Sequence, residues 1–328
     1  MGSAFYNDLL SRAAHTYTSD PIVRELLDSC AHLFRPGLRL GGALHFRALR
    51  GAAPDLAAHL PSTGGDGNSI AAWRAAVADI HAHSAQYAEL LERHVQTNEV
   101  ARSLPILASM LATSRQTRMP LRVFEIGASA GINLNFDRYG YAGDGWSWGE
   151  PDSPLQLRNT VLEGQPRDLD APLQIVERRG CDPHPLDVAN PVDADTLLGF
   201  VWPDQIHRIE RLRSAIEIAR RYPVMIEAAD GIDWIDRAVC PQPGAATAIM
   251  HTVIFEHMSA GEREALRRAI AQTGESASPE SPVAWVRMEP GEGGAYETRV
   301  TVWPGANEVF LARSDGHAQS LRWNVQAA

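Results

Sequence analysis

The feature that most constrains the fold is a short apolar run that ends in a turn of small residues. Leu121 to Gly127 reads LRVFEIG, and the turn continues as Gly127-Ala128-Ser129-Ala130-Gly131. β-branched and aromatic residues favour an extended strand, while glycine allows the backbone conformations of a sharp turn. The residues from Gly131 to Tyr139 favour the first turns of a helix. A strand, a tight turn and a helix in this order are typical of α/β proteins.

Further short apolar runs follow, and helical stretches separate several of them. The runs are Leu173 to Glu177, Val224 to Ala228, Thr247 to Phe255 and Pro282 to Glu289; the helical stretches are Gln205 to Arg221 and Ala260 to Thr273. Strands that alternate with helices indicate parallel strands joined by crossovers. Near the C-terminus, PGAN separates ETRVTVW from EVFLAR, which is typical of an antiparallel hairpin. We therefore predict a mainly parallel α/β sheet that ends in an antiparallel hairpin.

The residues before this sheet are predicted to be helical. Apolar residues recur at three- and four-residue steps between Ile70 and His94, and a second helix is expected from Asn98 to about Ser114. We expect a helical domain over residues 1–115 and the α/β domain over residues 116–328. Residues 141–171 are rich in Gly, Trp, Asp and Pro, and they are expected to form an insertion in the second domain.

Composition argues against several classes of function. The formal net charge is −10, and all 30 basic residues are arginine, so no lysine can form a Schiff base or bind phosphate in a P-loop. An acidic chain lacks the basic footprint of a nonspecific nucleic-acid binder. Three widely spaced cysteines form no CxxC pair, and the histidine spacing predicts no metal site. No apolar stretch approaches the roughly 20 residues of a membrane span. We therefore expect a cytoplasmic protein with no nucleic-acid or membrane partner.

The turn after the first predicted strand resembles a known cofactor-binding motif. The spacing E-x-G-x-S-x-G, from Glu125 through Gly127 and Ser129 to Gly131, resembles the first motif of S-adenosylmethionine-dependent methyltransferases. Ser129 stands where a middle glycine is common. The spacing also departs from the G-x-G-x-x-G pattern of dinucleotide-binding proteins. Class I methyltransferases have a mainly parallel sheet that ends in a hairpin, so the predicted fold is class I methyltransferase-like.

Acidic residues that follow the next two strands are the expected contacts of a bound nucleoside. Asp182, in GCDPHP, is the first candidate to accept hydrogen bonds from the ribose hydroxyls, and Glu177 is the second. Asp182 could instead form an Asx turn before Pro183. Asp230 is the candidate for the adenine amino group, with Gly231 allowing close approach of the ligand. Asp230 could equally be a helix N-cap.

Candidate catalytic residues are sought after the fourth and fifth predicted strands, because ligands bind at the carboxyl ends of such strands. His251 is added to them although it lies inside the fourth run. His257 and His251 are the first candidates for the base that removes a proton from the methyl acceptor. Glu256 and Glu289 are candidates for orienting the substrate.

A polar segment between the two predicted helices forms a further candidate site. It contains Gln96, Asn98, Glu99 and Arg102. Arg102 could bind a carboxylate of the cofactor or the substrate, and Asn98 and Glu99 could bind an amino group. A helix-capping turn with an internal Glu–Arg pair is the alternative interpretation.

Several segments together resemble a bacterial family catalogued as domain of unknown function 2332. They are FEIGASAGINLNFDRYGY, HVQTNEVARS, RRGCDPHPLDV, VWPDQIHRIERLRSAI and DGHAQSLRW, and they extend over nearly the whole chain. The resemblance implies a helical N-terminal region and a predicted methyltransferase-like domain, but no substrate. We expect an S-adenosylmethionine-dependent methyltransferase that acts on a small molecule, with a homodimer left open. The alternatives are a noncatalytic nucleoside-binding regulatory protein and an NAD-dependent oxidoreductase.

Overall fold

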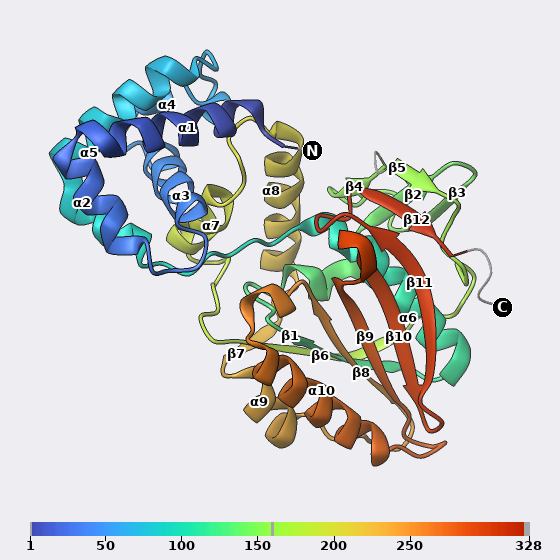
Figure 1. The fold of residues 1–328 in the computed structure, drawn as a ribbon. Coiled ribbons are helices and arrows are strands. Elements are labelled where there is room, and N and C mark those ends of the chain that lie inside the picture. The colour runs from blue at the N-terminus through green and yellow to red at the C-terminus, as the bar shows by residue number, and fades with distance from the viewer. Residues whose placement is uncertain (1, 159–160, 325–328) are drawn as a thin grey trace. The chain divides into compact units, whose positions relative to one another are not determined.

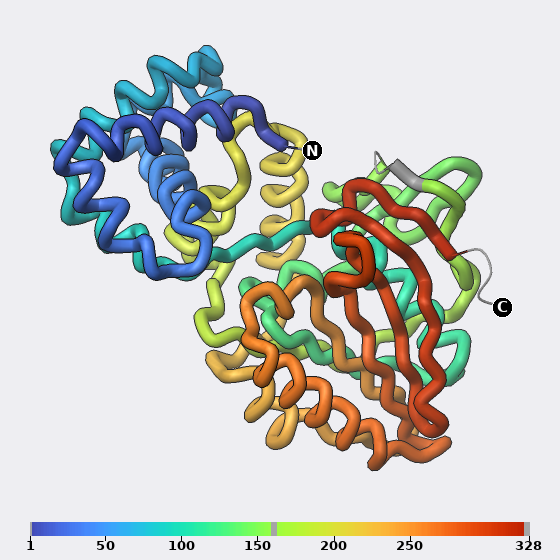
Figure 2. Tube along the Cα trace, in the orientation of Figure 1, coloured from blue at the N-terminus to red at the C-terminus, as the bar shows by residue number. Residues whose placement is uncertain are grey.

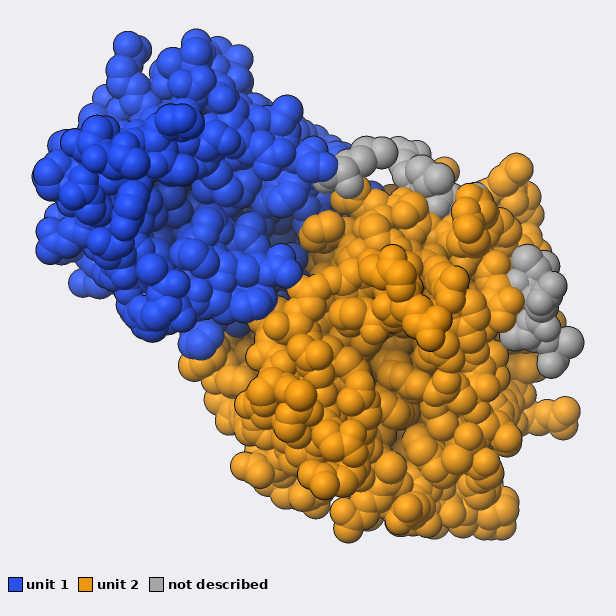
Figure 3. Space-filling model, viewed as in Figure 1, with its two compact units in different colours: residues 1–98, 187–213 blue, residues 99–186, 214–328 orange. Residues whose placement is uncertain are grey.

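The computed structural model describes residues 2–158 and 161–324, which form two compact units. Unit 1 comprises residues 1–98 and 187–213, and unit 2 comprises residues 99–186 and 214–328 (Figure 3). The division differs from the expected boundary at residue 115. Residues 99–115 belong to unit 2 because the helix that they begin packs on its sheet. Residues 187–213 return to unit 1, a long-range association that no local sequence pattern reveals.

Unit 1 is helical and has its own hydrophobic core. Its elements are α1 (Ala4–Ser19), α2 (Pro21–Cys30), α3 (Pro36–Leu49), α4 (Pro54–Ala57), the 3₁₀ helix η1 (Pro61–Thr63), α5 (Ser69–Leu91) and α7 (Pro191–Gly199), and α8 (Ile206–Arg221) begins in it. Core residues from α1, α2, α3 and α5 include Leu9, Val23, Leu44 and Ile80. The predicted helix over 70–94 is α5, and the Asn68 side chain caps it by accepting a hydrogen bond from the Ala71 amide at 3.1 Å.

Unit 2 is built on a sheet that has nine strands within the described residues. Their order is β5-β12-β11-β10-β9-β8-β1-β6-β7. The bounds are β1 (Leu121–Ile126), β5 (Val161–Glu163), β6 (Ile175–Asp182), β7 (Met225–Ala228), β8 (Ala246–Thr252), β9 (Val283–Pro290), β10 (Tyr296–Trp303), β11 (Asn307–Ser314) and β12 (Ser320–Trp323). Strands β7, β6, β1, β8 and β9 are mutually parallel, while β9 to β12 form an antiparallel meander (Figure 1). The predicted α/β sheet and its C-terminal hairpin, β10 and β11, are confirmed.

Helices cover both faces of the parallel half of the sheet. The 3₁₀ helix η2 (Val100–Arg102) leads into α6 (Ser103–Thr117), which packs on β8 to β11. On the opposite face lie α9 (Gly231–Ala238), the 3₁₀ helix η4 (Phe255–His257) and α10 (Ala260–Glu275), whose Leu266 and Ile270 share a core with Phe124 and Trp285 (Figure 1). The short 3₁₀ helix η5 (Glu292–Gly294) joins β9 to β10. Glu125 alternates with Phe124 and Ile126 along β1, so its side chain points to the face of η2 and α6.

The connection from β1 to β6 differs from the predicted one. The residues after Gly131 form a 3₁₀ helix, η3 (Ile132–Arg138), and the described residues 127–158 and 161–174 contain no α-helix. A small sheet of β2 (Gly140–Gly143), β3 (Trp146–Gly149) and β4 (Gln156–Leu157) follows, and β5 then pairs with β12 at the far edge of the large sheet (Figure 2). Figure 2 traces this excursion from the turn after β1 and back to β6. The insertion expected over 141–171 is therefore the greater part of the crossover itself.

In the part of the chain that the structure describes, no helix is long and apolar enough to cross a membrane.

Candidate functional site

The centre of the parallel half of the sheet is where ligands bind in α/β proteins. β1 lies between β6 and β8, so the chain leaves β1 to one side and later returns to its other side. Crevices form at the carboxyl ends of strands at such a topological switch point. The carboxyl end of β1 is therefore the place to examine first.

The predicted turn lies at this point, with a strained backbone. Gly127, Ser129 and Gly131 all have positive φ, at 70°, 53° and 67°. Positive φ carries no steric penalty for glycine but is uncommon for serine, so Ser129 is held there by its surroundings. A Cβ added at Gly127 would lie 2.6 Å from Ile254 Cγ2, and one added at Gly131 would lie 2.8 Å from Ile226 Cδ1. Ile254 and Ile226 thus lie where a side chain would be, so both positions require glycine.

Asp182 anchors the turn to β6. Its Oδ2 accepts a hydrogen bond from the Ser129 amide at 2.8 Å, and its Oδ1 accepts one from the His184 amide at 2.8 Å. The second bond is the Asx turn that the sequence left open, and the first bond helps to hold Ser129 at positive φ. Glu177, the other candidate for the ribose, pairs with Arg122 at 2.6 Å near the start of β1. It lies at the opposite end of the strands, so we no longer assign it to the ribose.

Asp230 and Gly231 form the start of α9. The exposed Asp230 accepts hydrogen bonds from the amides of Ile232, at 2.8 Å, and Asp233, at 3.3 Å. It is therefore the N-cap that the sequence offered as an alternative. A Cβ at Gly231 would lie 2.5 Å from Ile126 Cγ2, so this glycine allows close packing against β1 rather than approach of a ligand.

Glu125, at the switch point, has a carboxylate oxygen whose hydrogen-bonding capacity the described residues leave unused. Its side chain is buried, at 3% exposure, and its Oε2 has no hydrogen-bond partner among the described residues. Burial raises the pKa of Glu125 well above its usual range, the nearby Asp182 raises it further, and the charge of Arg102 partly offsets both effects. A buried carboxyl group without a donor is costly, and such groups are concentrated at functional sites.

The polar segment before α6 is helical only at its end, in η2 (Val100–Arg102). Glu99, and not Asn98, is the N-cap of η2, because its Oε1 accepts a hydrogen bond from the Ala101 amide at 3.1 Å. Arg102 is buried and donates from Nε to the Gly316 carbonyl at 2.9 Å. Glu99 and Arg102 belong to unit 2, whereas Gln96 and Asn98 belong to unit 1. The four residues therefore do not share one helical turn.

His251 lies in a closed network rather than in an accessible position. It is fully buried; its Nδ1 lies 2.7 Å from Glu289 Oε1, and its Nε2 accepts a hydrogen bond from Trp285 Nε1 at 2.9 Å. Glu289 also accepts from the amides of Ile254, at 3.0 Å, and Phe255, at 3.1 Å. Both ring nitrogens are engaged, so His251 cannot take a proton from a substrate in this arrangement. Glu289 likewise holds the loop after β8 instead of orienting a substrate.

The other two candidates after β8 are more accessible. His257 is exposed at the end of η4, and Glu256 is half-buried and accepts a hydrogen bond from the Tyr296 hydroxyl group. Val253, which begins this loop, has a φ of 58°, an outlier for a β-branched residue. The bonds from Ile254 and Phe255 to Glu289 account for this conformation, since they fix the backbone that follows.

Comparison with known proteins identifies the family. Residues 1–323 match the family described as "Uncharacterized protein conserved in bacteria (DUF2332)". The chain belongs to the DUF2332 family. The resemblance inferred from the sequence motifs is thus confirmed. No curated protein matches the chain.

One residue of this DUF2332 chain was missed as a site candidate. His317 lies in the loop between β11 and β12, and its Nδ1 is 3.6 Å from Glu99 Oε2. The segment DGHAQSLRW, used above for the resemblance, already contained it. Spacing alone could not connect it with Glu99, because 218 positions separate the two residues.

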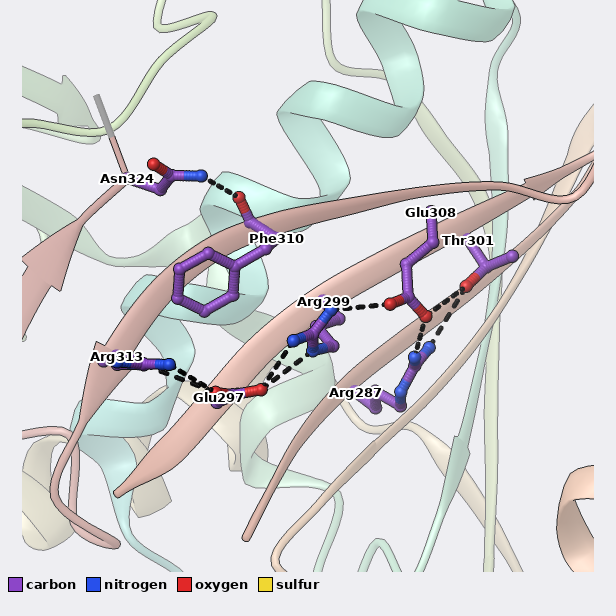
Figure 4. Close-up of polar contacts among 8 residues, drawn as sticks. All are labelled: Arg287, Glu297, Arg299, Thr301, Glu308, Phe310, Arg313 and Asn324. Carbon is purple, nitrogen blue, oxygen red and sulfur yellow. Dashed lines mark hydrogen bonds and ion pairs between the residues drawn. The ribbon is translucent and has the colours of Figure 1, made fainter. Parts of the chain in front are cut away.

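A second polar surface of the DUF2332 protein lies on the meander, next to α10. Arg287, Arg299 and Arg313 alternate with Glu297 and Glu308 across β9, β10 and β11 (Figure 4). A groove of about 290 Å³ lies beside them, lined partly by Trp285 and Arg267. Each of the five charged groups drawn in Figure 4 has an opposite charge beside it, so the ladder stabilises strand pairing.

Proposed function

We propose that this DUF2332 protein binds S-adenosylmethionine at the carboxyl ends of β1, β6 and β7, and that it transfers the methyl group to a small molecule. The observation that carries the proposal is the buried carboxyl group of Glu125 at the switch point, whose Oε2 has no hydrogen-bond partner among the described residues. The strand order β7-β6-β1-β8-β9 supports it, because it is the order of doubly wound nucleotide-binding sheets. A class I methyltransferase-like fold is part of the proposal.

The charges around Glu125 fit the amino-acid end of S-adenosylmethionine. That end carries an ammonium group, which needs acceptors, and a carboxylate, which needs a cation. Glu125 Oε2 is an acceptor without a donor, and Arg102 is close enough for its charge to act on Glu125. S-Adenosylmethionine would supply an electrophilic methyl group, so the protein has to position the acceptor and remove its proton.

The nucleoside end meets residues that already have structural roles. Each carboxylate oxygen of Asp182 accepts one hydrogen bond from a backbone amide. Each oxygen retains a second lone pair that can accept a hydrogen bond from a ribose hydroxyl. Asp230 caps α9 with Oδ1, while its exposed side chain lies after β7, beside the expected adenine position. A dinucleotide enzyme would be expected to add a sixth parallel strand, whereas β10 beside β9 is antiparallel.

Calorimetry with S-adenosylmethionine, S-adenosylhomocysteine, adenosine and NAD tests the proposal. We expect S-adenosylmethionine and S-adenosylhomocysteine to bind and NAD not to bind. Glu125→Gln should weaken S-adenosylhomocysteine by about 10- to 100-fold and leave adenosine unchanged, because adenosine lacks the ammonium group. Glu297→Gln is the matched control, since it removes a carboxylate from the ladder on the opposite face of the sheet.

Proton release gives a second readout. Glu125 holds a proton more readily than an ordinary carboxyl group, and an arriving ammonium group favours the ionised form. Binding at mildly acidic pH should therefore release up to about one proton, measured by repeating the titration in buffers of different ionisation enthalpy. The release should vanish in Glu125→Gln. If neither S-adenosyl compound binds the folded protein, the proposal is rejected; binding without transfer to any acceptor would favour the regulatory alternative.

A further inference from the structure

The groove beside the ladder has the composition of a small-molecule site. It measures about 290 Å³, and residues of η4, α10, β9 and β10 line it, all within unit 2. Arg267, Arg287 and Arg299 bring three guanidinium groups to it, and Phe255 and Trp285 bring aromatic surface. Ligand pockets combine apolar surface with a few polar groups that orient the ligand, and they range upward from about 300 Å³. The groove therefore suits a compact molecule.

The ladder beside the groove has fewer carboxylates than guanidinium groups. Glu308 pairs with Arg287 and, at 2.6 Å, with Arg299. Glu297 pairs with Arg299 at 2.8 Å and with Arg313 at 3.1 Å. Three arginines thus share two carboxylates (Figure 4), which leaves the ladder with one more positive than negative charge.

Glu289 is the other acid among the residues that line the groove, and its oxygens are already engaged. Its Oε1 lies 2.7 Å from His251 Nδ1 and accepts a hydrogen bond from the Ile254 amide, while Oε2 accepts one from the Phe255 amide. In the described part of the chain it forms no ion pair with an arginine. Its charge therefore serves the loop after β8 and does not neutralise the arginines of the groove.

Arg267 has the weakest carboxylate partner of the three lining arginines. Its Nη1 lies 3.9 Å from Glu264, and both side chains are largely exposed, at 45% and 58%. Exposed ion pairs of this kind contribute little, so Glu264 does not hold the guanidinium group tightly. The same group lies over the Phe255 ring, 4.8 Å from its centre, which places it at the aromatic part of the groove.

The charges of the lining arginines also repel one another. Burial lowers the pKa of Arg287; Glu308 opposes this effect, and the charges of Arg299 and Arg267 lower the pKa further. The Arg287 guanidinium group lies over the Trp285 ring, 4.0 Å from its centre. An anion between Arg267 and Arg287 would relieve the repulsion, and a carboxylate matches the planar fork of a guanidinium group.

We propose that this groove binds a small monocarboxylate with an aromatic ring, its carboxylate between Arg267 and Arg287 and its ring against the aromatic surface. A single negative charge matches the single excess charge of the ladder. The ring would stack on guanidinium planes and on Phe255, both of which favour flat ligands. The groove lies on the face of the sheet opposite to Glu125, so the inference does not depend on the proposed methyl transfer.

A nuclear magnetic resonance titration of the full chain tests the proposal. The probe is 2-naphthoate, and neutral 2-naphthamide is its uncharged counterpart. The indole N–H signal of Trp285 reports binding at the groove, because its ring lines it, and the signal is assigned by its loss in Trp285→Phe. We expect 2-naphthoate to shift this signal with a dissociation constant of about 1 mM, typical of a ligand of this size. 2-Naphthamide should bind at least about 10-fold more weakly.

Three variants on α10 separate the charge of Arg267 from effects on folding. Arg267→Gln should weaken 2-naphthoate by about 10-fold or more. Arg268→Gln is the matched control and should stay within about twofold of the wild type, because Arg268 is exposed at the next position and does not line the groove. Glu264→Gln removes a competing anion and should bind at least as tightly as the wild type.

The assignment is overturned if 2-naphthoate leaves the Trp285 signal unmoved, or if 2-naphthamide binds equally well. Unchanged affinity in Arg267→Gln, or a loss in Arg268→Gln or Glu264→Gln as large as in Arg267→Gln, would overturn it as well. None of these measurements uses S-adenosylmethionine, so the outcome is independent of the test of the proposed function.

Discussion

Replacing Glu125 with glutamine should stabilise unit 2, and increasingly so as the pH rises. The folded-state pKa of Glu125 lies well above its usual range because burial and Asp182 both disfavour the charge. In the unfolded chain the same carboxyl group ionises near pH 4.5. Between those two values the folded protein holds a proton that the unfolded chain has lost, so the wild type loses stability with rising pH. Glu125→Gln keeps the shape of the side chain and does not titrate.

The size of this pH-dependent change in stability follows from the binding of one proton. A difference of one bound proton changes the free energy of unfolding by about 1.4 kcal/mol per pH unit. The free energy of unfolding of Glu125→Gln should therefore exceed that of the wild type by a difference that grows by up to about 1.4 kcal/mol per pH unit above about pH 4.5. The difference should stop growing at the folded-state pKa of Glu125. The test is urea unfolding between about pH 5 and pH 8, with amide exchange of β1 as the reporter, because the two units need not unfold together.

Glu297→Gln provides a control of opposite sign. Despite its burial, Glu297 has a lowered pKa because Arg299 and Arg313 favour its ionised form. Its contribution is present at neutral pH and is lost on acidification through its folded-state pKa, so this variant should be less stable than the wild type at neutral pH and approach it in acid. A Glu125→Gln advantage that does not change between about pH 5 and pH 8 would refute the raised pKa of Glu125 in the folded protein.

Three further substitutions test individual contacts by urea unfolding. Ser129→Gly should raise the stability by up to about 1 kcal/mol, because it removes the penalty of serine at positive φ, and a loss would show that its side chain matters more. Gly231→Ala should cost about 1–3 kcal/mol through the clash with Ile126. The double variant Gly231→Ala/Ile126→Ala should lose less stability than the sum of the two single variants. Trp285→Phe should cost about 1–3 kcal/mol by leaving His251 Nε2 without its donor, while S-adenosylhomocysteine affinity stays unchanged.

The sheet could be predicted from the sequence because its strands are marked locally. The run from Leu121 to Ile126 is buried along its whole length, and four of its six residues are apolar. PGAN likewise marks the turn between β10 and β11, and its Asn307 begins β11. The helical turns expected after Gly131 are present, but they form a 3₁₀ helix, η3, and the small sheet follows directly.

The roles of individual site residues were less predictable, because they depend on partners that are distant in sequence. His251 was a candidate base inside the fourth predicted strand, but Trp285 and Glu289, more than 30 positions later, occupy both of its nitrogens. Glu125 was expected at the site from its motif, but its unfilled acceptor could be seen only once its neighbours were in place. His317 required the folding of a loop that lies 218 positions from Glu99.

The long separation between Glu125 and Asp182 illustrates how chain length and distance differ. The 57 positions between them exceed the roughly 20 expected from the glycine turn to the acid in a simple nucleotide-binding unit. In the structure Glu125 pairs with Gly180 in register, and Asp182 reaches the Ser129 amide at 2.8 Å, so the excursion through β2 to β5 lengthens the chain without moving the acid from the turn. Asp182→Asn should therefore disturb the turn before it affects a ribose, because an amide can present only one acceptor oxygen to the two backbone donors. If Asp182→Asn binds adenosine more weakly, the same measurement on Ser129→Gly serves as the comparison. It separates loss of the turn from loss of the ligand contact.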